Sequence, residues 1–212
     1  MDLIHPLVQQ YAEEYSSPEE DLLKEVANWT REHHSESIML SGHLQGKFLE
    51  MISCLLKPER VLEIGTFTGY SALCLARGLA PNGQLHTIEI REEDAAVSRA
   101  YFNRSKYSSQ IILHTGNALK LVPELKETWD FVFIDADKPS YIQYFNLVLP
   151  NVRKNGLILA DNIFFHGQVL DDESKGKSAK GIRDFNEYIR QRKDIEKLIL
   201  TLRDGLFLIR KL

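Results

Sequence analysis

Two apolar stretches of this chain are each followed directly by polar side chains that could bind a cation. Asp135 and Lys138 come after one apolar run, and Asp161 and Asn162 come after the next. The carboxyl ends of parallel strands meet at one edge of an open sheet, so these side chains are expected to converge there. Two carboxylates and an amide oxygen suit a hard cation, Mg²⁺ first and Mn²⁺ or Ca²⁺ as alternatives. The plain alternative is that the two acids are turn residues that cap helices.

Lys138 stands three residues after Asp135 and could take part in proton transfer. A cation beside a substrate hydroxyl would lower the proton affinity of a neighbouring amine, which would let Lys138 act as a general base. The alternative is that Lys138 is an ordinary surface lysine. The position of Lys138 within this motif makes the surface-lysine interpretation the weaker one.

A second polar group surrounds a glycine-bearing turn. Glu63 lies inside an apolar run that ends at Gly65, and Glu89 ends the next apolar run. An acid about 20 residues after such a turn is placed to accept both hydroxyls of an adenosine ribose. Gly65 and Gly69 are spaced G-x-x-x-G, without the closer glycines that admit a pyrophosphate. The turn therefore favours a nucleoside cofactor that lacks a pyrophosphate, with S-adenosylmethionine as the candidate.

Alternating strands and helices are needed to bring these groups to one edge, and the sequence predicts them from residue 58 onward. The predicted strands cover residues 60–64, 85–88, 111–114, 131–134 and 157–160, followed by 195–202 and 206–210. Continuously apolar runs are typical of parallel strands that are covered on both faces. Asp204-Gly205 predicts a type I′ hairpin turn between the last two strands. The expected fold is α/β, a doubly wound, mostly parallel seven-stranded sheet with a C-terminal antiparallel hairpin.

Helices are expected in front of the sheet, and the whole chain of 212 residues is expected to form one domain. Residues 1–57 would be an N-terminal helical extension and residues 58–212 the α/β core. Ser17 is predicted to cap a helix with Pro18 at its first position. The charged, glycine-bearing segment 171–180 predicts a loop, followed by a helix over about 181–192.

Composition narrows the class of protein. The formal net charge of -4 argues against a protein that coats nucleic acid. The N-terminus has no basic segment followed by an apolar core, and no apolar run approaches the roughly 20 residues that span a bilayer, so a cytoplasmic protein without membrane contact is expected. Cys54 and Cys74 lie in apolar settings and are predicted to be buried free thiols.

The motifs together resemble those of the metal-dependent class I S-adenosylmethionine O-methyltransferases of the catechol and caffeoyl-CoA type. They are V-L-E-I-G-x-x-x-G-Y-S at 61–71, T-I-E at 87–89, G-N-A at 116–118, F-I-D-A-D-K at 133–138 and A-D-N at 160–162. The resemblance runs from about Met39 to the C-terminus, and the D-A-D-K and D-N motifs are its specific part.

The resemblance implies roles for individual residues. Asp135, Asp161 and Asn162 would hold a divalent metal, and Lys138, with Asp135, would be catalytic. Cofactor-binding positions would be Met39, Ser41, Glu63, Gly65, Thr66, Ser71, Glu89, Asn117, Ala118, Asp135 and Asp137. The family also implies a homodimer and a small-molecule acceptor with two vicinal oxygens.

Two parts of the chain depart from the family pattern. Pro139 follows the lysine where a polar residue is common, and it can begin the next helix. Residues 164–169 match only loosely, in a region that shapes substrate choice. His166 there could touch substrate, or it could be a loop histidine without that role.

Other functions stay open beside methylation of a catechol or caffeoyl-type molecule. Some bacterial members resemble enzymes that methylate 5-hydroxyuridine in transfer RNA. The basic residues that could contact its phosphates are Lys175, Lys177, Lys180, Arg183, Arg190, Arg192 and Lys193. Acids interleave with them, so a solvated surface is the alternative. A non-catalytic cofactor-binding protein is less favoured because the metal and lysine positions are intact, and a nicotinamide oxidoreductase is weaker still.

Overall fold

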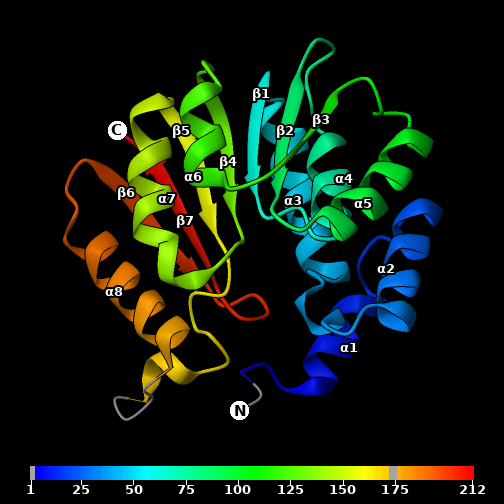
Figure 1. Cartoon of the computed structure of the whole chain (residues 1–212). Coiled ribbons are helices and arrows are strands. Elements are labelled where there is room, and N and C mark those ends of the chain that lie inside the picture. The colour runs from blue at the N-terminus through cyan, green and yellow to red at the C-terminus, as the bar shows by residue number, and fades with distance from the viewer. Residues whose placement is uncertain (1–2, 172–175) are drawn as a thin grey trace.

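The computed structural model describes residues 3–171 and 176–212, and its centre is one seven-stranded sheet (Figure 1). The strands are β1 Arg60–Ile64, β2 Gln84–Glu89, β3 Ile111–Thr115, β4 Trp129–Ile134, β5 Val152–Ala160, β6 Ile195–Leu200 and β7 Leu206–Lys211. The α-helices are α1 Pro6–Glu14, α2 Asp21–His33, α3 His43–Leu56, α4 Tyr70–Ala76, α5 Glu92–Arg104, α6 Ala118–Leu121, α7 Tyr141–Val148 and α8 Lys177–Gln191. Short 3-10 turns lie at Ser37–Met39, Val122–Glu124, Lys138–Ser140, Leu149–Asn151 and Gln168–Leu170.

The strand order is β3-β2-β1-β4-β5-β7-β6. Strand β7 is antiparallel to β5 and β6, and the other neighbouring strands are parallel. This confirms the predicted doubly wound, mostly parallel sheet that ends in an antiparallel hairpin. The order reverses between β1 and β4, and ligands of such sheets bind beyond the carboxyl ends of the strands at that point.

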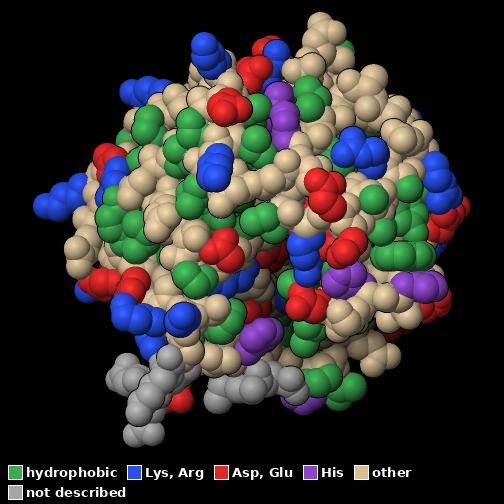
Figure 2. All heavy atoms as spheres, in the orientation of Figure 1, with side chains coloured by type: hydrophobic (Ala, Val, Ile, Leu, Met, Phe, Trp, Pro, Cys, Tyr) green, Lys and Arg blue, Asp and Glu red, His purple; other side chains and the backbone are tan. Residues whose placement is uncertain are grey.

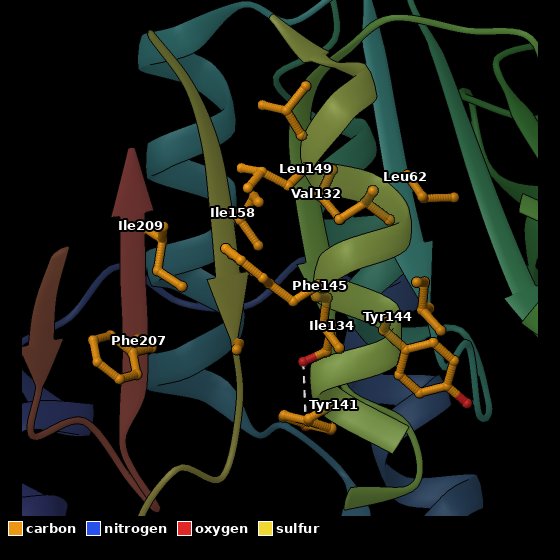
Figure 3. Close-up of a cluster of buried hydrophobic side chains, with 14 of the residues drawn as sticks. Leu62, Val132, Ile134, Tyr141, Tyr144, Phe145, Leu149, Ile158, Phe207 and Ile209 are labelled. Carbon is orange, nitrogen blue, oxygen red and sulfur yellow. Dashed lines mark hydrogen bonds between the residues drawn. The ribbon is translucent and has the colours of Figure 1, made fainter. Parts of the chain in front are cut away.

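Apolar side chains fill both faces of the sheet, which is why the central strands are continuously apolar. Leu62 of β1 packs in a cluster with α6, α7 and α8, and Figure 3 shows members of this cluster from β4, β5, β7 and α7. Val61, the next residue along β1, packs in the opposite cluster with α2, α3, α4 and α5. Alternate side chains of β1 therefore enter different cores, and full burial of each contributes roughly 1.5–3 kcal/mol to folding.

Helix α8 and strand β5 begin four and five residues earlier than the sequence predicts. Helix α8 begins at Lys177, because Ala179 belongs to the buried stripe that it shares with Ile182, Phe185 and Ile189. Residues 177–180 of the predicted loop are therefore helical, and residues 172–175 of it lie outside the described part of the chain. Strand β5 begins at Val152, and its exposed polar residues 153–155 hid this part of the strand from the apolar pattern.

The predicted N-cap at Ser17 and the predicted burial of Cys54 are wrong. Helix α2 begins at Asp21 after Glu20, which makes no side-chain capping bond. The segment before α2 is instead tied to α4, since Glu20 pairs with Arg77 at 3.1 Å. Cys54 is exposed on the outer side of α3, whereas Cys74 is buried. No helix in residues 3–171 and 176–212 has the length and apolar character needed to cross a bilayer.

The connection between β6 and β7 is not the predicted type I′ turn centred on Asp204-Gly205. The Gly205 N–H donates to the Leu202 carbonyl at 2.9 Å, so Arg203 and Asp204 are the central residues. A type I′ turn requires a positive φ at both central residues. Arg203 has a φ of 51°, but Asp204 is not among the residues with positive φ. The turn has this shape because the Phe164 N–H donates to the Asp204 carbonyl at 3.0 Å and docks it on the chain that follows β5.

Candidate functional site

A cavity of about 880 Å³ opens at the carboxyl ends of β1, β2, β4 and β5. In Figure 2 the hollow lies near the lower centre of the view, rimmed by acidic, basic and histidine side chains. The predicted site residues that line it are Met39, Ser41, Gly65, Thr66, Ser71, Glu89, Ala118, Asp135, Asp137, Lys138 and Asn162. The fold thus brings together residues from all five motifs of the sequence.

Gly65 allows β1 and β4 to meet at the floor of this cavity. Its φ is 102°, and a Cβ at this position would lie 1.9 Å from the Asp135 carbonyl oxygen. The Asp135 N–H also donates to the Ile64 carbonyl at 2.9 Å. A residue without a side chain is therefore required for Asp135 to stand beside the glycine turn.

Glu63 lies behind the cavity wall and is fully buried. Burial raises the pKa of its carboxyl to about 8, against hydrogen bonds from Ser71 and Thr87 that lower it. Its Oε1 has no hydrogen-bond partner among the described residues. A buried carboxylate with a free oxygen is suited to a cationic ligand group, which would stabilise its ionised form.

Glu89 is held rigidly at the end of β2. One carboxylate oxygen accepts from the Phe67 N–H at 2.6 Å, and the other accepts from the N–H groups of Ile90 and Arg91 at 2.9 and 3.0 Å. The glycine turn and the carboxyl end of β2 are thus tied together at the cavity wall.

Lys138 is oriented by two oxygen atoms. Its Nζ donates to Asp135 Oδ1 at 2.8 Å and to the Tyr141 hydroxyl at 2.8 Å. The Tyr141 hydroxyl in turn donates to the Asp161 carbonyl at 3.0 Å. This chain of contacts links β4, α7 and the end of β5, so the lysine amine stands beside both acidic strand ends.

Asp161 is fully buried and lies just behind the cavity wall. Its Oδ2 accepts from Gln45 Nε2 at 2.6 Å and its Oδ1 from the Asn162 N–H at 2.6 Å. Burial, and then the negative charge of Asp135, raise the pKa of the Asp161 carboxyl to about 7. A bound cation would offset the repulsion between these two carboxylates.

The donor set fits a hard divalent cation. Asp135, Asp161 and Asn162 offer oxygen atoms only, which is the chemistry that Mg²⁺, Mn²⁺ and Ca²⁺ prefer. Within residues 3–171 and 176–212, no cluster of at least three His, Cys, Asp or Glu side chains is suited to a metal. A site here would therefore depend on the Asn162 amide for its third protein oxygen.

Asn117 is a predicted cofactor-binding residue, but its side chain does not line the cavity. Its Oδ1 accepts from the Leu119 N–H at 2.8 Å and caps α6, and it is absent from the residues that line the cavity. His166, in the loosely matching segment, does line the cavity.

Several residues at the site carry no sequence signal for that position. Gln45 and Tyr141 look like ordinary helix residues, and Asp204 looks like a turn residue. Gln45 contacts Asp161 across 116 residues, Asp204 contacts Asn162 across 42, and Tyr141 contacts the Asp161 carbonyl across 20 in addition to nearby Lys138. Pattern reasoning about neighbours in sequence cannot detect such contacts.

The chain is similar to a known protein family and to individual members of it. A family model described as O-methyltransferase matches residues 13–212. A catechol O-methyltransferase from Niastella koreensis is 36% identical over 199 residues, covering 92% of this chain and 90% of the relative. Caffeoyl-CoA O-methyltransferase 5 from Nicotiana tabacum is 30% identical over 206 residues, covering 92% of this chain and 85% of the relative.

Solved structures agree with the sequence relatives. The O-methyltransferase TomG from Streptomyces achromogenes, solved in complex with SAM, has a TM-score of 0.89 and 30% identity, covering 97% of this chain and 96% of that one. An O-methyltransferase from Bacillus cereus, solved with SAH, has a TM-score of 0.85 and 30% identity, covering 97% of both chains. Because the family match spans every strand of the sheet and the whole cavity floor, this chain belongs to the O-methyltransferase family.

Proposed function

We propose that this protein transfers a methyl group from S-adenosylmethionine to a hydroxyl of a small vicinal diol, of the catechol or caffeoyl type, with the help of a divalent metal. One observation carries the proposal. Gly65 allows Asp135 to lie directly against the glycine turn, so Glu89 and the polar group around Lys138 line one cavity, with the buried Glu63 carboxylate directly behind its wall.

The cofactor would occupy the part of the cavity at β1 and β2. Glu63, with its unpartnered buried oxygen, would receive the ammonium of the methionine part, and Glu89 would receive the ribose hydroxyls. Ser71 lies beside Glu63, and Ala118 lines the cavity where the adenine would rest. TomG and the Bacillus cereus enzyme bind SAM and SAH, which supports this assignment.

Asp135, Asp161 and Asn162 would hold the metal, with Mg²⁺ the first candidate and Mn²⁺ or Ca²⁺ the alternatives. When bound, such an ion lowers the pKa of a coordinated hydroxyl and orients it. Lys138 would accept the proton of that hydroxyl at Nζ, and Asp135 and Tyr141 would hold the amine in place. The substrate oxygen would form its bond to the methyl carbon while the carbon–sulfur bond breaks, with the electron pair of that bond remaining on the sulfur of S-adenosylhomocysteine.

Three of the six described basic residues that would contact transfer RNA are paired with acids, among them Arg192 with Asp194. Lys180 pairs with Asp184 at 2.5 Å, and Arg190 pairs with Glu187 at 2.7 Å. Lys175 lies outside the described residues. Neutralised charges attract phosphate weakly, so these contacts favour a small-molecule acceptor over RNA.

Labelled S-adenosylmethionine with Mg²⁺ tests the function directly. We expect purified protein to label members of a catechol and caffeoyl ester panel, to lose this activity in EDTA, and to leave undermodified transfer RNA unlabelled. EDTA-sensitive label on RNA alone would replace the acceptor in this proposal. Label on no acceptor, with S-adenosylhomocysteine still bound, would contradict it.

We also propose a homodimer in which α1 packs against a second copy. Helix α1 has no buried residue, and Leu7, Val8 and Tyr11 on it, with Tyr15 directly after it, are all at least 60% exposed. A helix that exposes several large apolar side chains gains stability when a partner surface covers them. Light scattering after size-exclusion chromatography should show twice the chain mass for the wild type and a monomer for the Leu7→Glu, Tyr11→Glu double variant. A monomeric wild type would refute the dimer.

A further inference from the structure

We propose that Asp204, in the turn between β6 and β7, is a positioning residue that sets the direction of the Asn162 side-chain amide and holds the segment that carries His166. This rests on the function proposed above, because Asn162 is one of the three proposed metal-binding residues. The C-terminal hairpin would then contribute to the site, which its Asp-Gly sequence alone does not predict.

The side-chain contacts of Asp204 run to both of those residues. Its Oδ2 accepts from Asn162 Nδ2 at 3.2 Å, and its Oδ1 accepts from the His166 N–H at 2.7 Å. A carboxylate accepts hydrogen bonds and donates none when ionised, so it selects the nitrogen of the Asn162 amide. The amide oxygen is then turned away from Asp204, which leaves it available for a cation.

Backbone contacts fix the turn in the same place. The Ile163 N–H donates to the Gly205 carbonyl at 3.2 Å, and the Phe164 N–H donates to the Asp204 carbonyl at 3.0 Å. A Cβ on Gly205 would meet the Phe164 ring at 2.5 Å. The turn and the chain after Asn162 are therefore one packed unit.

Unusual backbone geometry gathers around this unit. Asn162, Phe165, His166 and Arg203 all have left-handed φ values, of 56°, 45°, 55° and 51°. Residues with side chains visit this region rarely, and such conformations persist where surrounding contacts hold them and cluster at functional sites. Asp204 contacts two of these four residues through its side chain and directly follows a third in sequence.

The Asp204 side chain is also more deeply buried than is usual for a residue in a hairpin turn. Its side chain is only 7% exposed and lines the cavity, although hairpin turns ordinarily lie in solvent. A buried carboxylate is retained when it has partners that need it, and here those partners are Asn162 and His166.

The variant Asp204→Asn separates the two explanations of this residue. Asparagine is as good a turn residue as aspartate, so a purely structural role predicts no change. Its Nδ2 replaces one carboxylate oxygen and donates instead of accepting, so asparagine would place a donor against either Asn162 Nδ2 or the His166 N–H. Loss of an outer partner of this kind typically weakens metal binding by about 10–100-fold.

Two measurements on the whole chain test the proposal. Mn²⁺ binding, followed by electron paramagnetic resonance, should weaken by at least about 10-fold in Asp204→Asn, while affinity for S-adenosylhomocysteine stays unchanged. Hydrogen exchange without metal should show faster exchange at residues 162–166 in the same variant. Asp194→Asn, at an exposed acid outside the cavity, should match the wild type in both.

The outcomes separate this inference from the proposed function. If the wild type binds Mn²⁺ and Asp204→Asn binds it equally well, the positioning role is wrong. If the wild type binds no Mn²⁺, the proposed metal is wrong, and the exchange measurement then decides whether Asp204 holds the segment. Unchanged exchange at residues 162–166 overturns the inference with or without metal.

Discussion

Replacing Asp161 with alanine is expected to lower metal-stimulated methyl transfer by about 10³-fold or more, and to leave cofactor binding nearly intact. The carboxylate is fully buried, directly follows β5 and is one of the three proposed metal-binding groups. A catalytic metal supplies several kcal/mol of transition-state stabilisation, and each 1.36 kcal/mol is about tenfold in rate. The measurements are initial rates against Mg²⁺ concentration and calorimetric titration with S-adenosylhomocysteine.

Matched variants separate this effect from damage to the fold. Asp161→Asn keeps the volume of the side chain and removes its charge, so it should lose activity nearly as fully as Asp161→Ala. Asp184→Ala, at an exposed acid of α8, should keep wild-type rates. Activity of Asp161→Ala close to wild type, with the same Mg²⁺ dependence, would rule out the metal assignment.

Replacing Gly65 with alanine is expected to lower both stability and cofactor affinity, because the new methyl group has no space. It would lie 1.9 Å from the Asp135 carbonyl oxygen and 2.7 Å from the carbonyl carbon, both of them backbone atoms of the neighbouring strand end. The two strand ends must separate, which should lower the free energy of unfolding by about 3 kcal/mol or more. Affinity for S-adenosylhomocysteine should fall by at least about 100-fold, since Glu63 and Asp135 lose their spacing.

Gly42→Ala provides the control for backbone strain alone. Gly42 has a similar left-handed φ of 79°, but a Cβ there would meet no atom within 4 Å. Its ψ is 173°, a combination that residues with side chains rarely adopt, so alanine at this position should cost about 1–3 kcal/mol through strain alone. Urea unfolding of both variants measures the difference. Equal losses would show that strain alone, and not the contact with Asp135, explains the requirement for glycine at position 65.

The sheet was predictable because its signals are local. Each central strand is a short run of apolar residues, and Gly65, Asp135 and Asp161 stand at or next to the ends of those runs. In a parallel sheet, strand ends meet at one edge, so proximity in space followed from position along each strand. The cavity residues from Gly65 to Asn162 were therefore within reach of sequence reasoning.

Element boundaries that depend on packing were predicted less well. The start of α2 was misplaced because Glu20 pairs with Arg77 of the α4 C-terminus instead of serving a local cap. The start of α8 was misplaced because Ala179 is buried against the rest of the fold, which the charged residues around it conceal. In both cases a contact between distant segments outweighed the local preference.

The sequence by itself determined the α/β fold, the glycine turn with its acids, and the two acidic strand ends beside Lys138. Tertiary structure alone decided which residues orient them. Gln45 reaches Asp161 across 116 residues, and Asp204 reaches Asn162 across 42 residues. The physical reason is that apolar periodicity and turn preference act between neighbours in the chain, whereas hydrogen bonds that aim a carboxylate or an amide depend on how whole elements dock.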